Sequence, residues 1–98
     1  MISISNLFVA SFAANFSSRE AGRAAFEQIL AMMKSSDAIQ LDFDNRSLTP
    51  SFADECIGGL AAHLGLAEVK RRIKLQNIDD ISRPLVRHVV LRRSQIAA

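Results

Sequence analysis

The feature that most constrains the fold is a strand followed closely by the start of a helix. Apolar and polar residues alternate over residues 39–43, which is typical of a half-buried strand. The pair Thr49-Pro50 then predicts a helix, because proline suits the first helical position and keeps the residue before it extended. We therefore expect a strand-to-helix junction, with Thr49 as the N-cap and the hydroxyl of Ser51 in the first turn.

A capping box predicts an earlier helix. Ser17 and Glu20 lie three residues apart and precede an apolar stripe at helical spacing, so this helix should run from about Ser18 to about Lys34. Gly22 lies in the stripe, where a glycine costs about 1 kcal/mol relative to alanine. Its presence indicates that another backbone comes close to this face of the helix.

Periodicity and turn residues predict the remaining elements. Alternation at Ile2 and Ile4 predicts a strand, and the apolar stretch Leu7–Phe16 predicts either a second strand or an irregular segment. Gly58-Gly59 weakens the helix that begins at Pro50 but permits tight packing against a sheet. The other expected elements are a strand at Ala38–Phe43, a helix at Pro50–Leu64, a helical turn at Ala67–Arg72, a strand at Ile73–Gln76 and a last helix at Ile81–Ile96, with Ile81 facing inward and Pro84 in the first turn.

This alternation of strands and helices predicts one small α/β domain over residues 1–98, with a mixed sheet and helices packed on it. Strand–helix–strand crossovers should be right-handed. No apolar run is long enough to span a bilayer, and we expect no signal peptide in the first residues, which lack a basic leader and a convincing cleavage site. The single cysteine, Cys56, excludes an internal disulfide and should be a small buried residue. We expect a cytoplasmic protein without a metal or other cofactor.

Charge is distributed unevenly along the chain. Residues 70–98 hold eight basic and two acidic side chains, whereas residues 1–69 hold four basic and eight acidic ones. A basic segment of this kind can bind nucleic acid, although no aromatic residue interrupts it. One hypothesis is therefore an accessory protein that binds nucleic acid through Lys70, Arg71, Arg72 and Lys74.

Four blocks of residues carry a resemblance to a known family. The blocks are residues 18–23 (SREAGR), 41–43 (LDF), 51–55 (SFADE) and 73–77 (IKLQN). They resemble the STAS-like domain family of unknown function, which is similar in turn to the STAS domain of bacterial anti-sigma-factor antagonists. The resemblance covers the chain roughly from Ser17 to Val90, and the SFADE block is its most specific part.

The resemblance implies a regulatory module that is not an enzyme. In STAS antagonists a serine at the start of the helix after this strand is phosphorylated by a histidine-kinase-like ATPase, which often doubles as an anti-sigma factor. That position falls on Ser51, with Thr49 as the second candidate, while Pro50, Phe52 and Ala53 depart from the STAS pattern around the site. The implied partner-binding residues are Asp42, Asp44, Thr49, Ser51, Phe52, Asp54 and Glu55.

Plainer interpretations of these residues stay open. Ser51 could serve only as a helix-start residue, since Ser51-x-x-Asp54 itself fits a capping box. Asp42 and Asp44 could form an acid–base pair or hold a metal, but nothing near them supplies a third ligand, so Asp42 should instead fix the following loop. The apolar N-terminal region could also pair with a second copy in a homodimer.

Overall fold

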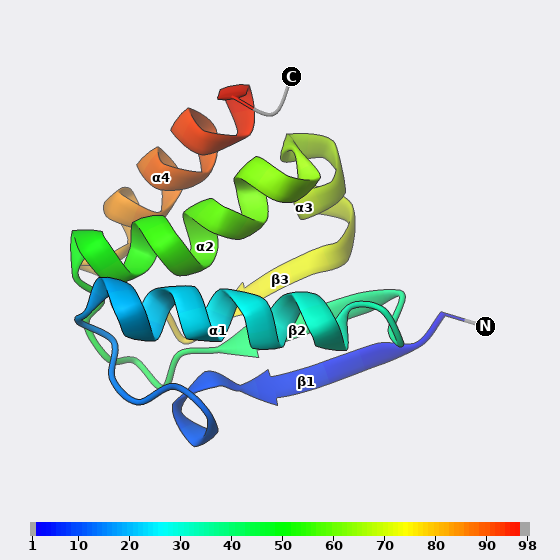
Figure 1. Ribbon diagram of the computed structural model, residues 1–98, viewed down its shortest axis with the longest axis horizontal. Coiled ribbons are helices and arrows are strands. Elements are labelled where there is room, and N and C mark those ends of the chain that lie inside the picture. The colour runs from blue at the N-terminus through cyan, green and yellow to red at the C-terminus, as the bar shows by residue number, and fades with distance from the viewer. Residues whose placement is uncertain (1, 97–98) are drawn as a thin grey trace.

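The structure is a computed structural model that describes the backbone of residues 2–96 and the side chains of residues 2–95 (Figure 1). Three strands, four α-helices and one short 3-10 helix make up this part of the chain. In chain order they are β1 (Ile4–Phe8), η1 (Val9–Ser11), α1 (Arg19–Met32), β2 (Ala38–Asp42), α2 (Pro50–Leu64), α3 (Leu66–Arg72), β3 (Ile73–Gln76) and α4 (Arg83–Ile96).

The strands form one sheet in the order β1-β2-β3, and both pairings are parallel. The α/β fold is confirmed, but the sheet is parallel rather than mixed. The physical reason is that a helical crossover, α1 or α2 with α3, separates each strand from the next. The helices α1 and α2 lie side by side on one face of the sheet, and α4 packs against α2 (Figure 1).

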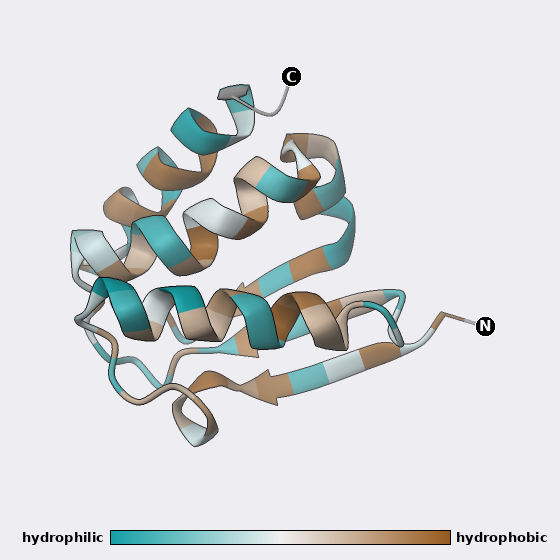
Figure 2. Ribbon diagram, in the orientation of Figure 1, coloured by the Kyte–Doolittle hydropathy of each residue, from teal (hydrophilic) through white to brown (hydrophobic). Residues whose placement is uncertain are grey.

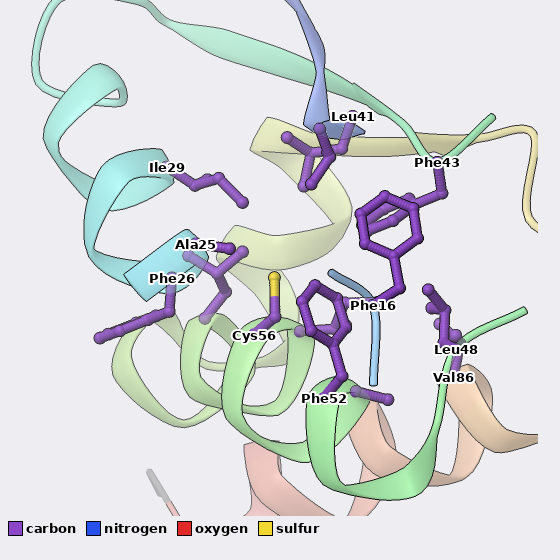
Figure 3. Packing of buried hydrophobic residues seen from close by; sticks show 14 of the residues in the cluster. Phe16, Ala25, Phe26, Ile29, Leu41, Phe43, Leu48, Phe52, Cys56 and Val86 are labelled. Atoms are coloured by element: carbon purple, nitrogen blue, oxygen red, sulfur yellow. The ribbon is translucent and has the colours of Figure 1, made fainter. Parts of the chain in front are cut away.

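Alternate strand residues and three phenylalanines build the core between the sheet and the helices. Ile39 and Leu41 of β2 are fully buried beneath α1 and α2. The ring of Phe16 lies between those of Phe43 and Phe52, with centroid distances of 5.7 and 5.2 Å (Figure 3). Hydrophilic and hydrophobic bands alternate along α1, as expected for a helix with one face on a core (Figure 2).

The N-terminal region contains one strand. Leu7 and Phe8 end β1, whereas residues 9–11 form η1 and residues 12–18 are irregular. The stretch Leu7–Phe16 is therefore not a second strand, and the irregular alternative is correct only for the residues after η1. Burial explains this: Val9 and Phe16 are core residues, and the Phe16 carbonyl accepts a hydrogen bond from Thr49 rather than from a neighbouring strand. The expected capping box is not formed, because the N-cap lies one residue later and Ala21, not Glu20, stands three residues after it. Ser18, not Ser17, caps α1 by accepting from the backbone N–H of Ala21 at 3.1 Å.

The last helix begins two residues later than expected. Its start at Arg83 leaves Ile81 outside the helix and 84% exposed, so the prediction that Ile81 faces the core is wrong. The reason is a turn at Asp79, whose carboxylate and carbonyl both accept from the backbone N–H of Ser82. Pro84 lies in the first turn of α4, as predicted.

Glycines set how closely the helices approach one another. A Cβ atom built on Gly22 would lie 2.8 Å from the Phe52 carbonyl oxygen, which confirms that α2 comes close to this face of α1. Gly58 and Gly59 face Val89 of α4 and Phe26 of α1, so they permit packing between helices rather than against the sheet. The α2 helix therefore packs closely against α1 and α4 at positions where a glycine leaves room for the neighbouring helix.

Arg72 connects the end of α3 to the end of α1. Its guanidinium donates hydrogen bonds to the carbonyl oxygens of Met33, Ser36 and Asp37, at 2.9, 3.2 and 3.1 Å. These carbonyls lie at and just after the C-terminus of α1, where helix carbonyls lack partners within the helix. The neighbouring Arg71 is exposed and pairs instead with Glu68 in its own helix, at 2.7 Å.

Gly22→Ala should destabilise the protein although alanine favours a helix. We expect the free energy of unfolding to fall by about 1–3 kcal/mol, because α1 and α2 must move apart. Urea unfolding followed by circular dichroism measures this. Ala24→Gly, at an exposed position of the same helix, should cost only about 1 kcal/mol. A stabilised Gly22→Ala variant would contradict the packing argument.

Arg72→Lys should lower the free energy of unfolding by about 1–2 kcal/mol, because a single ammonium cannot satisfy three carbonyls as a planar guanidinium does. Arg71→Lys is the matched control and should leave it nearly unchanged, because the Arg71 pair is exposed to solvent. The same urea titration compares the two variants. Equal losses would show that Arg72 has no special structural role.

Candidate partner-binding site

The candidate site lies where the carboxyl ends of the strands meet. Parallel strands end at a common edge, so the chain leaves β2 and enters α2 there through the loop of residues 43–49 (Figure 1). In open α/β sheets, ligands commonly bind outside the carboxyl ends of the strands. The junction predicted from Thr49-Pro50 is confirmed, because Thr49 is extended and Pro50 is the first helical residue.

Asp42 fixes the first half of the loop. Its carboxylate accepts a hydrogen bond from the backbone N–H of Asp44 at 2.8 Å, which is the role that sequence reasoning favoured. Asp44 and Asn45 both adopt positive φ angles, 59° and 56°, and the Asn45 N–H donates to the Asn77 carbonyl at 2.7 Å. Asp44 is exposed and Asp42 is half-buried, so of the two Asp44 is the more accessible.

The second half of the loop is held by residues that sequence reasoning missed. The Ser47 hydroxyl donates to the carboxylate of Asp79 at 3.0 Å, and the Leu48 N–H donates to the hydroxyl of Ser82 at 3.1 Å. Hydrogen bonds from Ser82 and Ser47 hold the pKa of Asp79 below its ordinary value. The spacing Asp79-x-x-Ser82, a helix-start pattern, was the available signal.

Thr49 is the N-cap of α2, and its hydroxyl is fully used. The hydroxyl oxygen accepts from the backbone N–H of Phe52 at 3.2 Å and donates to the carbonyl of Ser17 at 2.5 Å. Its backbone N–H donates to the Phe16 carbonyl. Phosphorylation of Thr49 would break the first two contacts, so it is a poor second candidate for modification.

Ser51 occupies the second helical position and does not cap α2, because Thr49 does. The residue is half-buried, and among residues 2–95 its hydroxyl has no hydrogen-bond partner. The capping interpretation of Ser51 is therefore not realised. Phe52, which follows it, is fully buried against Phe16 and belongs to the core, so it offers no surface on which a partner could dock.

Asp54 and Glu55 are already paired within the molecule. The Asp54 carboxylate contacts Arg92 and Arg93 of α4, both at 2.9 Å. Arg19, the first residue of α1, contacts Glu55 at 2.8 Å and Asp54 at 3.3 Å. The Asp54 carboxylate of α2 thus connects α2 to both α1 and α4. Asp54 and Glu55, which were expected to bind a partner, also hold the helices together.

Burial alone would raise the pKa of Asp54, whose side chain is only 20% exposed. Hydrogen bonds from Arg93 and Arg19, with the charges of Arg93 and Arg92, outweigh burial and hold that pKa below its ordinary value of 3.8. The pairs at Asp54 therefore stabilise the fold above that pH. Their contribution is lost as the pH falls through the lowered pKa.

The four cations of the nucleic-acid hypothesis do not act as one free cluster. Arg72 is bound to carbonyl oxygens and Arg71 to Glu68, which leaves Lys70 and Lys74 exposed. Lys70 lies beside an apolar groove of about 460 Å³ between α3, β3 and α4. The groove is lined mainly by aliphatic residues, which differs from the polar surface expected for phosphate binding.

The described residues at this edge include no cluster of potential metal ligands. Over the part of the chain that the structure describes, no three His, Cys, Asp or Glu side chains come together as metal ligands. Burial raises the pKa of the Cys56 thiol to about 12, in line with its predicted place in the core. Within the same part of the chain, no helix combines the length and apolarity needed to cross a bilayer.

Asp54→Asn should lower the free energy of unfolding at pH 7 by about 1–2 kcal/mol, because Arg93 and Arg92 lose their counter-charge. The difference from the wild type should shrink as the pH falls below 3.8, where wild-type Asp54 also becomes neutral. Urea titrations at several pH values measure it. Glu27→Gln, which removes an exposed pair with Arg23, is the control and should have little effect at any pH. A difference independent of pH would contradict the role of the ion pairs.

Comparison with known proteins agrees with this fold. Residues 21–83 match the family model described as a STAS-like domain of unknown function, and this match covers more than half of the chain. No curated protein and no solved structure matches the chain. The matched segment runs from the first turn of α1 to the start of α4 and includes the whole junction at Thr49. The chain therefore belongs to the STAS-like domain family of unknown function.

Proposed function

We propose that this protein is a regulatory protein-interaction module whose partner docks on the edge formed by the β2–α2 loop and the first turns of α2. The observation that carries the proposal is the Ser51 hydroxyl, which lies at the helix start with no hydrogen-bond partner among the side chains and backbone of residues 2–95, while Thr49 caps the helix. Exposed Asp44 and the accessible parts of Asp42, Asp54 and Glu55 lie on the same loop and helix start. Phe52 is not part of this docking surface because its side chain is buried.

Phosphorylation of Ser51 would control docking. The partner we propose is a histidine-kinase-like ATPase, as in the STAS antagonists that this family resembles. The Ser51 oxygen forms a bond to the γ-phosphorus of ATP as the bond to ADP breaks, and the hydroxyl proton passes to a base of the ATPase. The product carries about 1.5 to 2 additional negative charges on the docking surface.

The local structure can accommodate that charge. Pro50 has no N–H and Thr49 occupies the N–H of Phe52, so the N–H of Ser51 itself remains for the phosphate at the positive end of the helix. Ser51 lies three and four residues before Asp54 and Glu55, so all three share one helix face. Arg19 bridges those two carboxylates. A phosphate would compete for Arg19 and so change the surface a partner meets.

Incubation with the histidine-kinase-like ATPases of the source organism and Mg-ATP should add one phosphate, detected by intact-protein mass spectrometry. Ser51→Ala should abolish the modification, whereas Ser47→Ala, in the exposed loop nearby, should not. Ser51→Asp should weaken binding to the same ATPase roughly tenfold or more, about 1.4 kcal/mol, measured by calorimetry. Unchanged mass with every such ATPase, together with equal binding of wild type and Ser51→Asp, would overturn the proposal.

A further inference from the structure

The strand β1 is an open edge of the sheet with apolar side chains on it. It pairs only with β2, so its other side carries unpaired backbone groups over the described residues. Ile4 and Phe8 are 62% and 47% exposed, and together with Ile2 they are three of the five large exposed hydrophobic residues. Within β1, Ile4 and Phe8 alternate with the half-buried Ser5 and Leu7, so they point to the face of the sheet that α1 and α2 leave uncovered.

The hydrogen bonds between β1 and β2 identify which backbone groups of β1 face the open edge. The Ser3 carbonyl accepts from the N–H groups of Asp37 and Ala38, so Ser3 faces the β2 side. Backbone groups alternate along a strand, so Ser5 and Leu7 also face β2. The N–H and C=O groups of Ile4, Asn6 and Phe8 therefore face the open edge.

This edge lacks the features that usually protect one. From Ile4 to Phe8 the strand contains no charged residue, no proline and no glycine. The side chains on the uncovered face are, in order, isoleucine, asparagine and phenylalanine. Figure 2 accordingly shows hydrophobic colour at both ends of the strand and hydrophilic colour in the middle. Such a strand is chemically similar in both directions, which suits pairing with itself.

We propose that β1 is a homodimer interface, in which two copies pair antiparallel about a two-fold axis through Asn6. In this register Asn6 lies opposite the other copy's Asn6, and each Ile4 lies opposite a Phe8. All three form hydrogen-bonded pairs because their backbone groups face outward. The side chains meet on the uncovered face, where β-branched and aromatic residues form favourable cross-strand pairs. The uncharged strand meets no repulsion from its own copy.

The length of the strand limits the strength of the dimer. η1 begins at Val9 and ends β1 at Phe8, so only five residues of each copy can pair. An interface of this size is smaller than that of a typical stable complex, so the dimer should be concentration-dependent. The proposal is independent of partner docking at Ser51, because β1 and the β2–α2 loop use different backbone groups.

Sedimentation velocity over a concentration series of the full chain should show a monomer–dimer equilibrium. Asn6→Lys brings two like charges together at the axis and should raise the dissociation constant at least tenfold. Gln40→Lys is the matched control, because Gln40 is the β2 partner of Asn6 and lies on the same face away from the edge. A wild-type chain that stays monomeric throughout, or equal effects of the two variants, would overturn the proposal.

Disulfide trapping tests the register itself. Residues in a hydrogen-bonded antiparallel pair have Cα atoms about 5.5 Å apart, within the range that a disulfide spans. Asn6→Cys should therefore form a covalent dimer under mild oxidation, whereas Gln40→Cys should remain monomeric. The native Cys56 is buried and should not interfere. Cross-linking of both variants to the same extent would show random collision instead of the proposed pairing.

Discussion

The helices α1 and α2 lie on the same face of the sheet, and most other features of the molecule follow from this arrangement. The strands follow in the order β1-β2-β3, and each crossover between parallel strands is expected to have the same, right-handed sense. One face therefore forms the core with Ile39 and Leu41, while the other face stays open. The same arrangement brings the starts of α1, α2 and α4 to one edge, where the loop of residues 43–49 leads into α2 and bonds to the segments just before α1 and α4.

Close packing between α1 and α2 depends on Gly22, and ion pairs at Asp54 complement it. The uneven distribution of charge along the sequence contributes to the packing of these helices. The basic residues Arg92 and Arg93 approach the acidic start of α2 and neutralise part of it. The opposite charges of the two segments thus serve to dock α4 on α2. This explains why a basic C-terminal third need not indicate nucleic-acid binding.

Local signals in the sequence predicted the local structure. Thr49-Pro50 was sufficient to place the start of α2, and Gly22 was sufficient to predict the close contact with another backbone. Contacts between residues more than thirty positions apart were not predicted, as for Arg72 with the end of α1 or Asp54 with α4. No local pattern encodes such contacts, because they depend on how the crossovers place the helices. Phe52 was expected on the docking surface because it lies in the SFADE block of the resemblance, whereas its packing against Phe16 places it in the core.

The parallel sheet has a consequence for how the chain folds. Each pairing joins residues about 34 positions apart, as in Ile4 with Ala38 and Ile39 with Ile73, and no hairpin brings neighbouring strands together. A strand pair can form only after the intervening helix has brought the chain back, so loop-closure entropy opposes the earliest sheet contacts. Nascent α1 and α2 would therefore precede the sheet on the route to the native state. Until β2 is in place, the uncharged segment Ile4–Phe8 would remain unpaired along both of its edges.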